Sequence, residues 1–180
     1  MAPPIRRNIQ LATHLCRLWF FLAMASVVLL GLAVAQPNDY LALKAKAEKF
    51  YTERSYQEAH DLYQQADTMT LPPPEAGWVD FRLADTHWRS AASTRQADTS
   101  KLDQARQQLE ALVRDVRHIE DHDRVWAEVH ESLGDFWWAR RDWSRSWPYY
   151  RKALDWWAGD KDIALARQRY LGMVWNITTP

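Results

Sequence analysis

The sequence predicts an all-α fold made of about three helical hairpins followed by a last helix. The first observation is a pattern of small and aromatic residues that occurs twice with identical spacing: Ala47, Phe50, Ala59, Tyr63 and Ala66 recur as Gly134, Trp137, Ser146, Tyr150 and Ala153. This spacing suits two antiparallel helices that approach closely at the small residues. The second observation is that good helix formers dominate, and no stretch alternates apolar and polar residues as a half-buried strand would. One hairpin cannot bury its apolar face alone, so we expect the hairpins to stack into an α-solenoid.

Residues 1–35 are typical of a signal peptide, so we expect an N-terminal signal helix ahead of the folded domain, 36–180. Three arginines precede the apolar run 18–33, and Ala33-Val34-Ala35 follows as a small-residue cleavage site. The apolar run is shorter than the roughly 20 residues of a membrane span. We therefore predict a periplasmic or secreted chain that starts at Gln36, with an uncleaved inner-membrane anchor as the alternative.

Composition excludes several function classes. Cleavage removes Cys16, the single cysteine, so disulfide and thiolate chemistry are not expected in the mature chain. Cleavage also removes three of the 23 Lys and Arg but none of the 23 Asp and Glu, which leaves a net charge of −3 (20 against 23). A mixed-sign surface of this kind offers no basic footprint for nucleic acid. We expect no cofactor, and contact with a membrane only through residues 1–35 if they remain uncleaved.

The first hairpin is predicted over 40–71. Its first helix carries Leu43, Ala47 and Phe50 on one face, and a short turn at Arg54-Ser55 leads into the second helix. Prolines 72–74 are expected to stop that second helix, because proline lacks the amide donor.

The second hairpin is predicted over 75–117. Residues 91–100 (AASTRQADTS) are small and polar, so they are expected to form an expanded loop between its two helices. Residues 118–124 (HIEDHDR) are charged and are expected to form a linker.

The third hairpin is predicted over 125–158, with its turn at residues 140–142. Gly159-Asp160 is expected to break the second helix, and Asp160 to cap a last helix over 161–175. That last helix has no partner helix in the sequence, so it is either a capping helix or the start of a fourth unit.

These spacings resemble those of the tetratricopeptide repeat, in which small residues and aromatics recur with a period of about 34 residues. The first and third hairpins match best, with departures at Lys46 and Ser146. The second hairpin matches less well, because Asp80 and His87 fall at packing positions. The resemblance implies a tetratricopeptide-like solenoid that binds other proteins.

Three longer strings resemble the N-terminal repeat region of bacterial alpha-2-macroglobulin-like proteins: GWVDFRLADT from Gly77, ESLGDFWW from Glu131 and YYRKALDWWAG from Tyr149. In that family the repeats precede the macroglobulin domains of an exported protease trap. This chain lacks the thioester motif, the bait region and the macroglobulin strands, so trapping does not carry over to its residues. The resemblance implies an exported repeat module that contacts downstream macroglobulin domains.

A tetratricopeptide-like stack also implies a concave groove lined by the first helix of each hairpin. The residues that fall at groove positions are Lys44, Glu48, Tyr51, Phe81, Asp85, Trp88, Arg89, Glu131, Asp135 and Trp138. Such aromatic side chains flanked by charges suit an extended peptide or a partner helix. For the aromatic residues, packing in the core is the alternative, and for Trp88 it is the favoured one.

The third hairpin is rich in tryptophan, with adjacent pairs at 137–138 and 156–157. Neighbours on a helix point about 100° apart, so part of this surface is expected to meet something else. A downstream repeat comes first, then a protein partner or dimer mate, and then stacking on cell-wall sugars.

No catalytic or metal-binding motif stands out. His118 and His122 lie four residues apart, but no third ligand is visible, so a solvated linker is favoured over a metal site. We therefore predict a non-enzymatic, exported module that binds a protein or peptide in the cell envelope. The alternative is a glycan-binding module, or a small envelope hydrolase, that uses exposed tryptophans.

Overall fold

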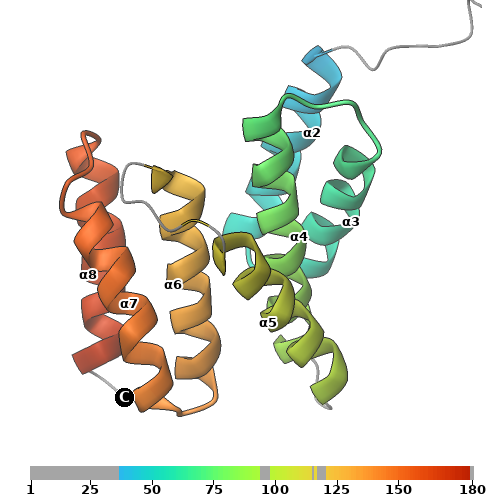
Figure 1. Ribbon diagram of the computed structural model, residues 1–180. Coiled ribbons are helices and arrows are strands. Elements are labelled where there is room, and N and C mark those ends of the chain that lie inside the picture. Colours follow the sequence, from blue (N-terminus) through green and yellow to red (C-terminus); the bar gives the residue numbers. More distant parts are fainter. Residues whose placement is uncertain (1–36, 94–97, 115, 117–120, 179–180) are drawn as a thin grey trace, which may run out of the picture. The chain divides into compact units, whose positions relative to one another are not determined.

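The computed structural model describes residues 37–93, 98–114, 116 and 121–178 (Figure 1). All regular structure in these residues is helical, which confirms the all-α prediction. Residues 1–36 are a separate unit from 37–180, and the predicted signal peptide lies outside the described residues. Among the described helices, none combines the length and the apolar character needed to cross a membrane.

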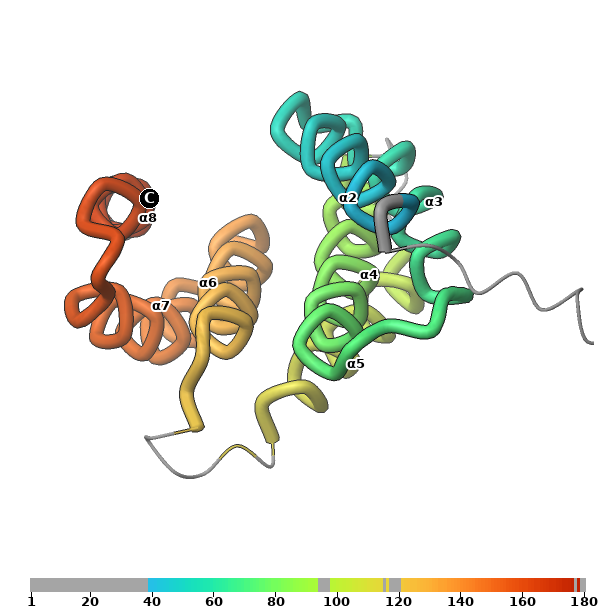
Figure 2. The backbone as a smooth tube through the Cα atoms, turned by 90° about the horizontal axis from the view of Figure 1, so that it is seen from above, coloured from blue at the N-terminus to red at the C-terminus, as the bar shows by residue number. Residues whose placement is uncertain are grey.

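Each described helix packs against the next one along the chain, and α4 also packs against α6. The helices are α2 (Pro37–Thr52), α3 (Tyr56–Asp67), α4 (Pro73–Ser93), α5 (Thr99–Arg114), α6 (Arg124–Ala139), α7 (Trp143–Trp157) and α8 (Ile163–Thr178). Seen from above, α6 lies between α4 and α7, and α8 lies beside α7 at the end opposite to α2 and α3 (Figure 2).

The two turns that the repeated pattern predicts share one backbone geometry. Arg54 follows α2 and Arg141 follows α6, and both adopt a left-handed conformation, with φ of 64° and 60°. In each turn the next residue donates its N–H to a carbonyl five residues back, from Ser55 to Phe50 at 2.9 Å and from Asp142 to Trp137 at 3.0 Å. This is a Schellman-type helix end. The predicted turns are therefore confirmed.

The proline run starts a helix instead of stopping one, which corrects the prediction for residues 72–74. Helix α3 already ends at Asp67, and Pro73 and Pro74 lie in the first turn of α4. Proline is tolerated there because the amides of the first turn have no partner within the helix.

The boundaries around the second hairpin and the last helix also differ from the prediction. Helix α4 extends to Ser93 and α5 begins at Thr99, so the expected loop over 91–100 shortens to 94–98, of which 94–97 lie outside the described residues. The cap of α8 is Asp162, not Asp160, because Asp162 accepts the N–H of Leu165 at 3.1 Å. Residues 118–120 of the predicted linker over 118–124 also lie outside the described residues, whereas Asp123 caps α6 and Arg124 belongs to that helix.

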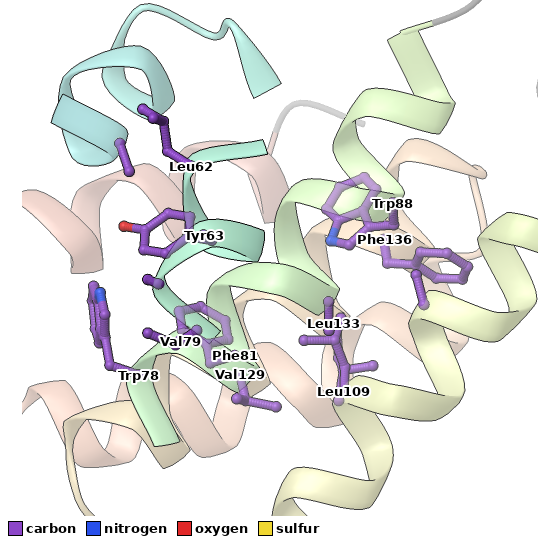
Figure 3. Packing of buried hydrophobic residues seen from close by; sticks show 14 of the residues in the cluster. Leu62, Tyr63, Trp78, Val79, Phe81, Trp88, Leu109, Val129, Leu133 and Phe136 are labelled. Carbon is purple, nitrogen blue, oxygen red and sulfur yellow. The ribbon is translucent and has the colours of Figure 1, made fainter. Parts of the chain in front are cut away.

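The buried side chains form two apolar clusters. The first cluster contains residues from each of the helices α2, α3, α4, α5 and α6, among them Tyr63, Phe81, Trp88 and Phe136 (Figure 3). The second joins α6 to α8 and includes Tyr150, Trp157 and Met173. Most small and aromatic residues of the repeated pattern are buried in these clusters or beside them, as predicted.

Gly134 shows why a small residue is needed where α6 and α7 meet. A methyl group added to Gly134 would lie 2.4 Å from Cδ1 of Tyr150, well inside van der Waals contact. Ser146 of α7 donates its hydroxyl to the carbonyl of Gly134 at 2.9 Å. The close approach of the two helices therefore depends on the absence of a side chain at this position.

Candidate functional site

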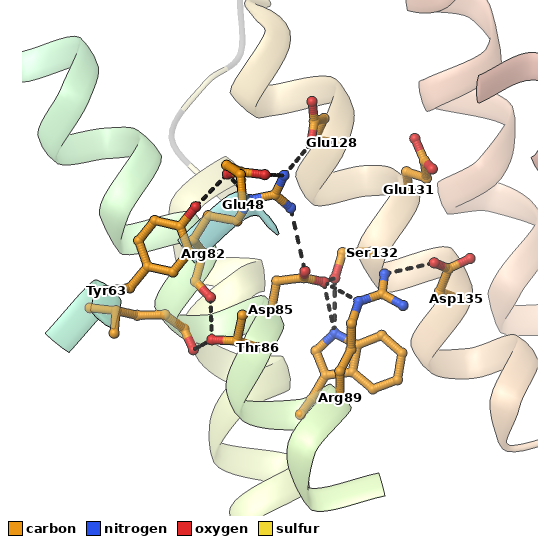
Figure 4. A network of polar contacts seen from close by, with 12 residues as sticks. Glu48, Tyr63, Arg82, Asp85, Thr86, Arg89, Glu128, Glu131, Ser132 and Asp135 are labelled. Carbon is orange, nitrogen blue, oxygen red and sulfur yellow. Dashed lines mark hydrogen bonds and ion pairs between the residues drawn. The ribbon is translucent and has the colours of Figure 1, made fainter. Parts of the chain in front are cut away.

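Most of the predicted groove residues meet in one polar network that runs across α2, α4, α6 and α8. We call this set the polar network, and Figure 4 shows most of its members. Its charged members are Glu48, Arg82, Asp85, Arg89, Glu128, Glu131, Asp135 and Arg169. The sequence prediction included five of these eight, and it missed Arg82, Glu128 and Arg169.

Arg82 of α4 lies at the centre of the polar network and is almost fully buried. Its guanidinium forms ion pairs with Glu48 at 2.9 Å, with Glu128 at 3.6 Å and with Asp85 at 3.6 Å. It also stacks on the ring of Tyr51, with its Cζ 4.0 Å from the ring centroid. Burial opposes the charge, but the surrounding acidic groups outweigh burial and raise the pKa of Arg82. This side chain therefore joins α2, α4 and α6.

Glu48 of α2 is held by donors from two other helices. Besides Arg82, the hydroxyl of Tyr63 and the indole N–H of Trp78 donate to its carboxylate, the latter at 3.1 Å. Lys44, one turn earlier, forms an ion pair with Glu75 at 2.8 Å. Both charged groove candidates of α2, Lys44 and Glu48, are thus bound to partners within the molecule.

Asp85 of α4 is fully buried and accepts three side-chain donors through Oδ1. Ser132 donates to it at 2.5 Å, Arg89 at 2.9 Å and the indole of Trp88 at 3.2 Å. Burial favours the neutral acid, but Arg89 and Arg82 outweigh burial and lower the pKa of Asp85. Trp88 lies in the core beside Phe136, so the core alternative holds for this residue.

Arg89 extends the polar network from α4 to α6 and α7. It forms an ion pair with Asp135 at 2.7 Å. Asp135 in turn accepts the hydroxyl of Tyr150 at 2.6 Å. Asn176 of α8 donates to the hydroxyl oxygen of Tyr150 at 3.2 Å. This branch of the polar network therefore extends from α4 through α6 and α7 to α8.

Arg169 fastens α8 to α6 through Glu131 at 3.1 Å and Glu128 at 3.4 Å. Burial is the main reason that the pKa of Glu131 is raised, to about 7; Arg169 opposes the shift, and Asp135 and Glu128 add to it. One carboxylate oxygen of Glu131 is buried without a hydrogen-bond partner. The charge of Glu131 therefore changes near neutral pH.

The two aromatic groove candidates outside the core are also engaged within the molecule. Tyr51 packs edge-on against Tyr56, with ring centroids 5.5 Å apart, and carries Arg82 on its face. Trp138 donates its indole N–H to the carbonyl of Asn176 at 2.7 Å and lies beside Trp143. The predicted groove residues thus come together in space, but they bind mainly to one another.

A second feature is an exposed apolar surface on α7 and α8, which we call the outer aromatic surface. Its members are Trp143, Trp147, Ile163, Tyr170, Leu171 and Trp175. The tryptophan-rich region was predicted to be partly exposed, but Ile163, Tyr170, Leu171 and Trp175 of α8 were not predicted as surface residues. The signal was present, because residues 163, 170, 171 and 175 have the spacing of one helix face.

Other tryptophans of the third hairpin are used inside the molecule. Trp126 and Trp157 are buried in the second cluster, and Trp156 donates to the carbonyl of His122 at 2.8 Å. In the adjacent pair 156–157, Trp157 is therefore in the core and Trp156 is half-buried. An adjacent pair of tryptophans does not by itself indicate a binding surface.

A pocket of about 980 Å³ is lined by residues of α5, α6 and α7 and by His122, one of the two histidines considered above as metal ligands. In its wall, the ring of Trp126 packs between the rings of two histidines. The ring centroid of Trp126 lies 3.7 Å from that of His122 and 4.0 Å from that of His130. His118 lies outside the described residues. No group of three or more metal-ligating side chains occurs among the residues that the structure describes.

His130 is buried in this region and donates Nδ1–H to the carbonyl of Trp126 at 2.8 Å. Burial lowers the pKa of His130 to about 4, and the nearby Lys152 and His122 act in the same direction while the carbonyl opposes them. The imidazole is therefore neutral at physiological pH, and it serves the packing of α6.

A comparison of this chain with known protein families, with curated proteins and with solved structures finds no match.

Proposed function

We propose that this protein is an exported, non-enzymatic helical-repeat module that mediates protein–protein interaction. The observation that carries the proposal is the outer aromatic surface, which gathers nearly all the exposed large hydrophobic side chains of the described residues on α7 and α8. Exposed large apolar side chains concentrated on two neighbouring helices are a feature of protein-binding surfaces. Leu41 on α2 is the one such residue elsewhere in the described chain.

The proposed architecture is a tetratricopeptide-like α-solenoid. Its support is the shared pattern of small and aromatic residues, the shared turn geometry after α2 and α6, and the packing of each helix on the next. Because the polar network occupies the predicted groove, we propose that the groove acts mainly as an internal brace. The outer aromatic surface is then the first candidate for partner binding.

The proposed cellular setting is the bacterial envelope. Its support is the signal-peptide pattern of residues 1–35 and the resemblance of three strings to the N-terminal repeats of alpha-2-macroglobulin-like proteins. In this setting the module acts within or beside a macroglobulin-like protease inhibitor and contacts its other domains.

A glycan-binding module is the second candidate, and one specific observation favours it. Trp143, Trp147 and Trp175 are all exposed, and exposed indoles suit stacking on sugar rings. A hydrolase would also need two carboxylates fixed across an open cleft. The clustered carboxylates of the polar network are instead bound to arginines, which favours binding over hydrolysis.

Site-specific photo-crosslinking separates the two candidates. A photoreactive amino acid replaces Trp147 in one variant and Leu41 in a control variant, and both are expressed in envelope-containing cells. The protein-binding proposal expects a discrete protein adduct from position 147 that is absent from position 41. Co-sedimentation with isolated wall polymer, together with no protein adduct from position 147, would favour the glycan candidate instead.

A further inference from the structure

The pocket lined by α5, α6 and α7 is separate from both surfaces described above. None of its described lining residues belongs to the polar network or to the outer aromatic surface. Its volume of about 980 Å³ is at the upper end of the range of about 300–1,000 Å³ that small-molecule sites occupy. The lining is mostly apolar and includes Val113, Val116, Tyr149 and Trp156. An apolar pocket of this size suits a small organic molecule.

One buried side chain of the pocket keeps a hydrogen-bond acceptor without a partner. His130 lines the pocket and is only 2% exposed. Its Nδ1 lies 2.8 Å from the carbonyl oxygen of Trp126, which can only accept, so the single proton of the neutral imidazole is on Nδ1. Nε2 therefore keeps its lone pair, and no donor among the described residues bonds to it. Because Nε2 is not closed off by protein atoms, a molecule in the pocket can donate to it.

A hydrogen-bond donor, the ammonium group of Lys152, lines the same pocket. Burial is the main cause of the low pKa of His130, and the positive charge of Lys152 acts in the same direction, so the two groups lie within electrostatic reach of each other. Lys152 is exposed and forms no ion pair with a residue that the structure describes. The pocket therefore offers one acceptor and one donor in the same region.

The charges of the described lining are balanced, which favours a ligand without a fixed charge. Three cationic and three acidic residues line the pocket: Arg114, Lys152, Lys161, Glu110, Asp155 and Asp160. Glu110 is already bound by Arg106 through both carboxylate oxygens, at 2.8 and 2.7 Å. A neutral group that both donates and accepts can bind here without bringing an unpaired charge into an apolar site.

We propose that this pocket binds a small phenol, with its hydroxyl between His130 and Lys152 and its ring on the apolar wall. A hydroxyl can donate to Nε2 of His130 and at the same time accept from Nζ of Lys152. The aromatic ring suits a wall that contains Tyr149 and Trp156, because aromatic rings pack favourably on one another. This inference does not depend on the proposed protein-binding function, since the pocket and the outer aromatic surface share no residue.

Isothermal titration calorimetry on the full-length chain tests the inference with two probes of nearly the same shape. The first probe is β-naphthol, which carries the phenolic hydroxyl, and the second is its methyl ether, which has no proton to donate. We expect saturable binding of β-naphthol that is about tenfold tighter than that of the ether, because only β-naphthol can donate to His130.

Two variants are expected to remove this preference, Lys152→Met and His130→Phe. Each should weaken β-naphthol binding about fivefold to tenfold and leave binding of the ether within about twofold. Lys152 is exposed, so Lys152→Met is expected to keep the fold even if circular dichroism shows that His130→Phe does not. Lys49→Met, which changes an exposed lysine of α2, is the matched control and should retain the preference.

Two further variants locate the bound probe. Val116→Trp adds bulk to the pocket wall and is expected to abolish binding of both probes. Trp147→Ala changes the outer aromatic surface and should bind both probes as the natural protein does.

Three results would overturn the inference: no saturable binding of β-naphthol, equal affinity for the two probes, or a preference that persists in Lys152→Met. Loss of binding in Trp147→Ala but not in Val116→Trp would assign the probe to the outer aromatic surface and would overturn it as well.

Discussion

At the scale of single residues, two glycines with the same helical backbone conformation differ in what surrounds them. Gly134 lies where α6 and α7 touch, and Gly172 lies on the open side of α8. The backbone geometry of both is helical, so the contrast comes from what surrounds each Cα and not from conformational freedom.

Gly134→Ala is expected to destabilise the protein, and Gly172→Ala is its control. The new methyl group at 134 would overlap Tyr150, which forces the helices apart at a cost of about 1–3 kcal/mol. At position 172 the methyl group meets nothing, and the higher helix propensity of alanine is expected to add up to about 1 kcal/mol. Urea unfolding of both variants measures the difference. Equal midpoints for the two variants would contradict this account of the α6–α7 contact.

His130 is expected to make the protein sensitive to acid. Burial holds its pKa at about 4, below the usual value of about 6.5, so the unfolded chain takes up a proton more readily than the folded one. The stabilisation is therefore complete above pH 6.5 and is lost as the pH falls toward 4, by up to about 3 kcal/mol. The free energy of unfolding at pH 7 and pH 4.5 is compared with that of His130→Gln. The variant should lose less stability between these two pH values.

Glu131 is expected to act in the opposite direction. Its pKa is raised to about 7, mainly by burial, so the folded chain holds a proton that the unfolded chain has released. Stability from this group is present below about pH 4.5 and is lost as the pH rises through about 7. Glu131→Gln keeps a hydrogen-bond acceptor for Arg169 but cannot ionise, so it should gain stability relative to the natural protein as the pH rises from about 4.5 to about 7. Thermal melts across this range test it, and parallel curves would assign the pH dependence to other groups.

At the scale of elements, the polar network links helices that are distant in the sequence. Arg82 alone contacts carboxylates from α2, α4 and α6, and Arg169 brings in α8. The apolar clusters supply most of the buried area, but they are non-directional. The charged contacts also constrain how each helix is rotated about its axis, because each pair requires particular side chains to face one another.

Arg82→Met is expected to destabilise the protein by about 3–5 kcal/mol, because it leaves buried carboxylates without their partner. Lys49→Met is the control, since the Lys49–Glu53 pair is exposed with a distance of 3.9 Å. Exposed pairs of this kind contribute at most about 1 kcal/mol. Guanidinium unfolding gives both free energies. Similar small losses in the two variants would show that the polar network contributes little.

At the scale of the whole molecule, the arrangement divides the surfaces by role. The side where α2, α4, α6 and α8 meet is occupied by intramolecular ion pairs, and the outer aromatic surface lies on α7 and α8. We therefore expect partner binding to respond to changes at the outer aromatic surface and to be largely insensitive to Tyr51→Ala, provided that the variant remains folded.

The proposed export concerns the whole chain, and N-terminal sequencing tests it. The Ala33-Val34-Ala35 site predicts that the mature protein recovered from the envelope fraction begins at Gln36. The cleaved protein would contain no cysteine, because Cys16 is removed. A recovered protein that still contains Cys16 would instead support the uncleaved anchor.

The sequence alone predicted the helical class, the turns after α2 and α6, and the small and aromatic residues that pack between them. These features are local: they depend on helix propensity, on spacing within one hairpin and on a turn of a few residues. The role of the prolines at 72–74 was predicted wrongly, because proline can end one helix or begin the next, and neighbouring residues decide which.

Only the tertiary structure decided which charged residues pair and which apolar residues remain exposed. Arg82, Glu128 and Ser132 gave no signal in sequence, since their contacts depend on how α4 and α6 are rotated and how closely they pack. Trp88 and Trp138 were both groove candidates, with the core favoured for Trp88; Trp88 is indeed in the core, and Trp138 is bound to α8. The exposure of the apolar residues of α8 follows from the same cause, because burial depends on neighbouring helices and a stripe of apolar residues does not specify which helix packs on it.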